Sequence, residues 1–99
     1  MRSKFEENTV TIYLEGNVDT TNAEEVGAEI NAIKAEYADA ALVLDAEDLK
    51  YISSAGLRVL LSEQKAVNAK AGKMVIKNVN ATIMEVFEIT GFIDILTIE

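Results

Sequence analysis

The sequence feature that most constrains the fold is a change in the spacing of apolar residues around residue 50. Residues 40–44, Ala-Ala-Leu-Val-Leu, form a continuous apolar run that favours a buried strand. The leucines between residues 57 and 61 instead fall on one face of a helix. Between the two, residues 45–50 are mostly charged, so we expect an acidic loop there. The segment predicts a strand–loop–helix unit in which Ser54 is the N-cap, a position that serine favours.

The rest of the chain supplies further elements of both kinds. We expect an edge strand at residues 2–6, a turn, and a strand at residues 9–15 whose apolar and polar residues alternate and which Gly16 ends. A Thr-x-x-Glu capping box at residues 21–24 opens a helix that extends to about residue 37.

The helix that follows Ser54 is expected to extend to about Ala71, where Gly72 ends it. A strand at residues 73–77, a short helix ended by Gly91, and a final strand at residues 92–98 complete the chain.

This order, β-β-α-β-α-β-α-β, predicts an α/β fold with one domain over residues 1–99. Alternation of strands and helices implies parallel pairing, whereas the tight turn between the first two strands makes those two antiparallel. The prediction is a small mixed sheet with helices mainly on one face.

Composition excludes several classes of function. The chain has no cysteine and no histidine, so it has no thiolate nucleophile, no Ser-His-Asp triad and no metal site built from those residues. The net charge of −8 disfavours nucleic acid and anionic membrane as partners. No signal peptide and no apolar run of about 20 residues is present, so a cytoplasmic location is expected. We expect no cofactor, no metal and no catalytic residue.

The candidate site lies beyond the carboxyl ends of the strands, where ligands and partners of open α/β sheets commonly bind. Three loops are expected to converge there: residues 16–20, 45–54 and 78–80. The start of the helix after Ser54 offers free amides to an anion. Gly56 is compatible with close approach of another molecule or with tight packing of this helix.

Residues 52–61, Ile-Ser-Ser-Ala-Gly-Leu-Arg-Val-Leu-Leu, resemble the signature segment of STAS domains, the family of bacterial anti-sigma factor antagonists. Residues 14–19, Leu-Glu-Gly-Asn-Val-Asp, are similar to the Gly-x-x-Asp loop of that family, and the order of elements agrees over essentially the whole chain. Many members carry one more helix after the last strand, so the resemblance implies a truncated variant of the fold.

The resemblance implies a switch at a serine. In the family, the segment typically reads Asp-Ser-x-Gly-Leu, and its serine is phosphorylated by a partner that is both an anti-sigma factor and a kinase. Carried over, that serine is Ser54, and the unmodified protein sequesters the anti-sigma factor; a phosphatase is a further possible partner. The family aspartate is Ser53 here, which makes Ser53 the second candidate for phosphorylation. The implied partner-binding residues are Asp19, Thr20, Ser53, Ser54, Gly56, Leu57 and Arg58.

Two other interpretations stay open at this point. A receiver-like domain would use Asp45 as its phosphoacceptor, with Asp19 holding Mg²⁺ and Lys77 nearby. A module that binds its partner constitutively would use Ser53 and Ser54 only as helix caps.

Overall fold

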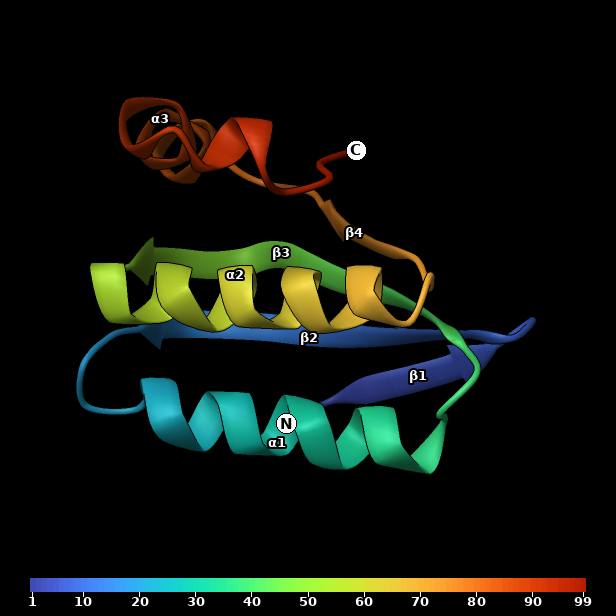
Figure 1. Cartoon of the computed structure of the whole chain (residues 1–99). Helices are drawn as coiled ribbons and strands as arrows, with labels where there is room; N and C mark the ends of the chain where they lie inside the picture. Colours follow the sequence, from blue (N-terminus) through green and yellow to red (C-terminus); the bar gives the residue numbers. More distant parts are fainter.

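The computed structural model describes all of residues 1–99 and consists of one sheet and three α-helices (Figure 1). The elements are β1 (Ser3–Glu6), β2 (Thr9–Val18), α1 (Ala23–Glu36), β3 (Ala41–Ile52), α2 (Ser54–Ala69), β4 (Met74–Lys77), α3 (Ala81–Thr90) and a 3₁₀ turn (Phe92–Asp94). The strands lie in the order β1-β2-β3-β4, with β1 antiparallel to β2 and the remaining pairs parallel. The predicted mixed α/β sheet is confirmed.

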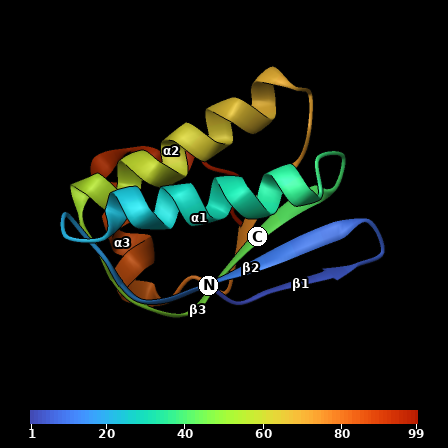
Figure 2. The same cartoon turned by 90° about the horizontal axis from the view of Figure 1, so that it is seen from below.

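The core lies between the sheet and one layer of helices. Alternate residues of β2 and of the first half of β3, among them Ile12 and Leu44, are fully buried and belong to one cluster with Ile30 of α1, Leu60 of α2 and Phe87 of α3. Figure 2 shows α1 and α2 on the same side of the sheet, with no helix on the opposite side. The helices therefore cover one face, as predicted.

The predicted acidic loop at residues 45–50 is wrong, because this segment continues β3. The register places Tyr13 opposite Asp45 but Glu15 opposite Asp48, and then Gly16 opposite Leu49 but Asn17 opposite Tyr51. At each step β3 accommodates one extra residue, which is the signature of a bulge. The two bulges replace the alternating burial of a regular strand by buried residues three apart, at Ala46, Leu49 and Ile52. The charged side chains between them point to solvent.

β2 also extends further than the sequence indicated. Gly16 adopts a left-handed φ of 68°, but it does not end the strand, which continues to Val18 opposite Ile52. The amide of Ser53 then donates to the carbonyl oxygen of Val18 at 2.9 Å. This bond fixes the start of α2 against the end of β2.

The predicted capping box is wrong as well. α1 begins at Ala23 with Asn22 as its N-cap, and the side chain of Thr21 bonds to Asp19 rather than to the helix. The side-chain nitrogen Nδ2 of Asn22 donates to the carbonyl oxygen of Asn17 at 2.8 Å, and the side-chain oxygen Oδ1 of Asn22 accepts from the backbone amide of Asp19 at 2.9 Å. Asn22 therefore organises the loop that connects β2 to α1.

The final strand predicted at residues 92–98 is absent. Residues 92–94 form a 3₁₀ turn after Gly91, which ends α3 with a left-handed φ of 80°. Only one residue pair, Ile76 with Ile98, then extends the sheet, through bonds from Ile76 to Thr97 and from Glu99 to Ile76. α2 is also shorter than predicted: it ends at Ala69, and the left-handed residue after it is Ala71 rather than Gly72.

A buried ion pair links α1 to α2. The Lys34 ammonium lies 2.6 Å from a carboxylate oxygen of Glu63, and the two side chains are 15% and 4% exposed. Such a pair holds two elements in register without adding much net stability, since both charges lose their hydration. The pair therefore fixes α1 and α2 relative to one another.

Candidate functional site

The start of α2 is built around Ser53, which is the true N-cap. Ser53 has extended backbone angles, with φ −94° and ψ 178°, and its hydroxyl oxygen accepts from the amide of Gly56 at 3.4 Å. Ser54 is then the first residue inside the helix, so the predicted N-cap was one residue too late. The reason is that β3 extends as far as Ile52, which leaves only Ser53 between strand and helix.

Ser54 is the exposed hydroxyl of the site. Its hydroxyl makes no hydrogen bond within the protein. The backbone N–H groups of Ser54 and Ala55 likewise have no hydrogen-bond acceptor within the protein. These amides belong to the first turn of a sixteen-residue helix, where the positive end of the helix dipole favours an anion. The Ser54 side chain is thus exposed to solvent, whereas the Ser53 side chain caps the helix.

Gly56 and Leu57 were predicted to contact the partner, but both residues are buried in this structure. A Cβ atom on Gly56 would lie 2.7 Å from both Ile52 Cγ1 and the Val18 carbonyl oxygen. Leu57 is 3% exposed and belongs to the core. Both residues therefore set the position of α2 on the sheet, and close packing explains the glycine.

The loop after β2 lies next to the start of α2, because Val18 pairs with Ile52 and accepts from Ser53. Asp19 accepts two hydrogen bonds from Thr21, at 2.6 Å from the hydroxyl and 2.9 Å from the amide. The hydroxyl bond from Thr21, followed by the amide bonds, lowers the pKa of Asp19 below its ordinary 3.8. Asp19 is half-buried and structural, whereas Thr20 and Arg58 are exposed, and Arg58 lies one turn after Ser54 on α2.

The lowered pKa of Asp19 leads to a prediction. Because the folded-state pKa lies below the unfolded one, this carboxylate stabilises the fold fully above pH 3.8, and its contribution is lost as the pH falls through the folded-state value. We expect Thr21→Val to raise the pKa of Asp19 part of the way back, because the amide bonds remain. A carboxyl NMR titration measures the change, and an unaltered titration would contradict the assigned cause.

A second prediction concerns the cap. The Ser53–Gly56 bond is long, and Asp at an N-cap adds negative charge beside the positive end of the helix. We expect Ser53→Asp to raise the free energy of unfolding by about 0.5 kcal/mol and Ser53→Ala to lower it by a similar amount. Urea unfolding measures both changes. Equal stability of the two variants would show that position 53 does not cap α2.

The other predicted loop and the receiver-like grouping are placed elsewhere. The side chain of Asn78 donates to Asp45, and that of Asn80 donates to the Leu49 carbonyl oxygen, so residues 78–80 lie along β3 rather than at Ser53. Asp45 is opposite Tyr13, roughly 20 Å along β3 from the end where Asp19 lies. Lys77 pairs with Glu99 at 3.6 Å. No three carboxylates lie close enough to hold a metal ion, so the receiver-like site is not formed.

Tyr51 is a surface residue that the sequence pattern alone did not indicate. It lies two residues before Ser53 and is 53% exposed, whereas its neighbour Ile52 is buried. An exposed aromatic side chain at a site is a common anchor for a protein partner. Tyr51 and Ile52 are both apolar and lie next to a bulge in β3, so the sequence alone does not indicate which of the two side chains faces solvent.

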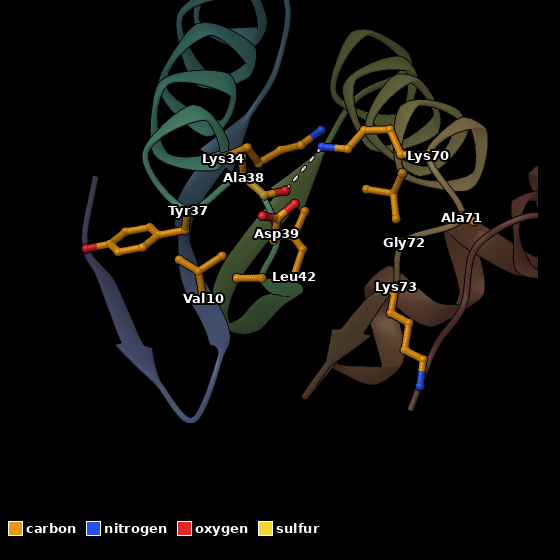
Figure 3. A pocket seen from close by; sticks show the side chains of 12 residues that line it. Val10, Lys34, Tyr37, Ala38, Asp39, Leu42, Lys70, Ala71, Gly72 and Lys73 are labelled. Carbon is orange, nitrogen blue, oxygen red and sulfur yellow. Dashed lines mark hydrogen bonds between the residues drawn. The ribbon is translucent and has the colours of Figure 1, made fainter.

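A cavity lies at the opposite end of the helices (Figure 3). It measures about 210 Å³ and lies between the C-terminal ends of α1 and α2. Figure 3 shows Lys34 and Lys70 pointing toward one another at this cavity, where Lys70 donates to the Ala38 carbonyl oxygen at 3.4 Å. None of the predicted site residues lines it, so the cavity is separate from the Ser54 surface. No helix of the structure has the length and apolar character needed to cross a membrane.

Comparison with known proteins gives consistent matches. The family model of the STAS domain matches residues 1–99. The chain is 40% identical over 85 residues to a Bordetella bronchiseptica protein provisionally named the anti-sigma factor antagonist BtrV, covering 86% of this chain and 72% of that one. It is 27% identical to the anti-sigma-B factor antagonist of Bacillus subtilis, covering 96% and 85%.

Solved structures show the same fold. SpoIIAA, a Bacillus cell fate determinant and anti-sigma factor antagonist, has been solved in unphosphorylated and phosphorylated forms. Both superpose on this chain with a TM-score of 0.72, at 22% and 23% identity. They match 99% of this chain and 86% and 89% of their own chains.

Proposed function

Because the chain belongs to the STAS domain family, we propose that it is an anti-sigma factor antagonist that phosphorylation of Ser54 switches off. The unmodified surface around Ser54 binds an anti-sigma factor and so frees the sigma factor. The observation that carries this proposal is that two adjacent serines have different roles. Ser53 caps α2, whereas the Ser54 hydroxyl is exposed and makes no hydrogen bond within the protein.

The fold is suited to carry the modification. A phosphoryl group adds about −1.5 to −2 charge at pH 7. On Ser54 that charge would face the free amides of Ser54 and Ala55 and the positive end of the helix dipole. Phosphorylation should therefore leave this domain folded and act on the partner, by bulk and by repulsion of like charge.

The replacement of the family aspartate by Ser53 fits this scheme. The position is the N-cap of α2, and serine and aspartate are both favoured caps. The substitution therefore preserves the local structure that presents the next residue. We propose that the anti-sigma factor is also the kinase, that Ser54 is its target, and that a phosphatase restores the active form.

The names of two relatives support the partner class. The Bordetella bronchiseptica and Bacillus subtilis proteins are both named as antagonists of anti-sigma factors. The experiment is titration calorimetry with each recombinant anti-sigma factor of the source organism, using the unmodified protein and the protein with phosphoserine at position 54. One of these proteins should bind the unmodified form and lose affinity for the modified one. Equal affinity for both forms would favour a constitutive module, and no binding at all would refute the proposal.

Tyr51 gives a further prediction for the same surface. We expect Tyr51→Ala to weaken binding of the anti-sigma factor by roughly tenfold, the usual scale for an aromatic interface anchor. The free energy of unfolding should change little, since the side chain is 53% exposed. Phe5→Ala is the matched control, because Phe5 is 47% exposed but stacks on Tyr37 at the far end of α1. Equal binding losses in the two variants would contradict an anchor role for Tyr51.

A further inference from the structure

Arg58 and Ser54 form a pair on the surface of α2. They are four residues apart, so their side chains lie one turn apart on the same face of the helix, and both are exposed. Four ion pairs occur in the structure, and none of them includes Arg58. The guanidinium is therefore a free cation beside the free hydroxyl.

Arg58 also borders a groove between α1 and α2, which lie side by side in both Figure 1 and Figure 2. The groove is shallow, with a volume of about 400 Å³, and Arg58 is the only cation that lines it. Of its two carboxylates, Glu63 is neutralised by Lys34, and Glu24 is exposed and unpaired on the α1 side. An occupant that matches this surface carries an acidic group opposite Arg58 and a basic group opposite Glu24.

Gly27 keeps the groove open without being required by the fold. A Cβ atom at this position would meet only Val59, at 3.8 Å, which is an ordinary contact distance. Glycine inside a helix is less favourable than alanine by about 1 kcal/mol. The packing of α1 against α2 therefore does not explain this glycine, whereas an occupant that approaches the α1 backbone does.

We propose that Arg58 is the residue through which the phosphorylation state is read. In the unmodified protein, an acidic side chain of the anti-sigma factor docks in this groove on Arg58. A phosphate on Ser54 then forms an intramolecular ion pair with the Arg58 guanidinium, which is no longer available to the acidic side chain of the partner. An anion one turn before a cation on a helix is the favourable order, and phosphate can accept two hydrogen bonds from one guanidinium. This inference rests on the proposed function and adds the mechanism by which the modification acts.

The intramolecular pair can be tested without a partner. The protein with phosphoserine at position 54 is titrated by ³¹P NMR, with and without Arg58→Ala, and with Lys65→Ala on the same helix as the control. Glu24, Glu63 and Asp19 stay unchanged in every variant. We expect Arg58→Ala to raise the second pKa of the phosphate by roughly 0.3 unit, and Lys65→Ala to leave it in place. The same phosphate pKa with and without Arg58 would overturn the proposal.

The groove is tested by binding of the recombinant anti-sigma factor to Arg58→Ala and Gly27→Leu, with the exposed Ala32→Leu on α1 as the control. We expect each groove variant to bind at least tenfold more weakly and the control to bind normally; thermal unfolding checks that all three are folded. Gly27→Ala, which fits the fold, is the fallback if the leucine variant unfolds. Normal binding by the groove variants together with loss of binding by Ser54→Asp would overturn this inference alone. Normal binding by Ser54→Asp would instead remove the proposed function.

Discussion

Ser54→Asp is expected to weaken binding of the anti-sigma factor by roughly 100-fold, about 2.7 kcal/mol, while Ser54→Ala binds as the unmodified protein does. The carboxylate places a negative charge where phosphate would lie, beside a surface that the partner must contact. Alanine keeps that surface neutral and removes only an unbonded hydroxyl. Titration calorimetry on the three proteins measures the difference.

The fold provides the control for this experiment. Ser54 is not the cap, so Ser54→Ala should change the free energy of unfolding by less than about 0.5 kcal/mol. A larger loss on Ser54→Ala, with binding intact in Ser54→Asp, would show that Ser54 is structural and that the switch lies elsewhere.

Gly56→Ala is expected to give the largest loss of stability of any single methyl group added to this chain. The added Cβ would lie 2.7 Å from the carbonyl oxygen of Val18, which is part of β2 and cannot move without the strand. Overpacking of this kind costs about 1–3 kcal/mol. We expect a loss of about 2 kcal/mol and a Tm lower by roughly 10 °C, since 1 kcal/mol corresponds to about 4–8 °C in a domain of this size.

Gly27→Ala is the matched control, because it adds the same methyl group to a helical glycine where only Val59 is near, at 3.8 Å. We expect this variant to be as stable as the unsubstituted protein or more stable, by up to about 1 kcal/mol. Thermal and urea unfolding of both variants measure the contrast. Similar stability of the two would mean that α2 can shift on the sheet, and that Gly56 does not fix the position of Ser54.

The sequence patterns were reliable where burial is regular. The alternation in β2 and the helical spacing in α1 and α2 predicted elements that the structure contains, because each pattern reports one face against one core. Gly91 was correctly predicted to end α3 for a similar reason, since a C-terminal glycine acts through its own backbone neighbourhood.

The errors arose where pairing with a distant strand decides the conformation. The polar residues of segment 45–50 resemble a loop, but two bulges let them continue β3 with their side chains in solvent. Residues 92–98 are apolar enough for a strand. After Gly91, however, the backbone N–H groups of residues 94–96 bond to carbonyl oxygens of Gly91 and Phe92 in a 3₁₀ turn, so they do not pair with a strand. Local pattern carries no information about either event.

The site was predicted in outline and corrected in detail. The motif located the start of α2, but only the bond from Ser53 to Val18 shows that the helix begins at Ser54. This shift by one residue exchanges the roles of the two serines. Gly56 and Leu57 match the family motif because they pack α2 onto the sheet, and Tyr51 emerged only from its exposure.

The most direct test of the switch is to identify the serine that the partner kinase modifies. The purified kinase and ATP are incubated with the unsubstituted protein and with Ser53→Ala and Ser54→Ala, and the phosphopeptides are sequenced by mass spectrometry. We predict one phosphate on Ser54, retained in Ser53→Ala and lost in Ser54→Ala. Phosphate on Ser53, or phosphate still incorporated by Ser54→Ala, would contradict the account.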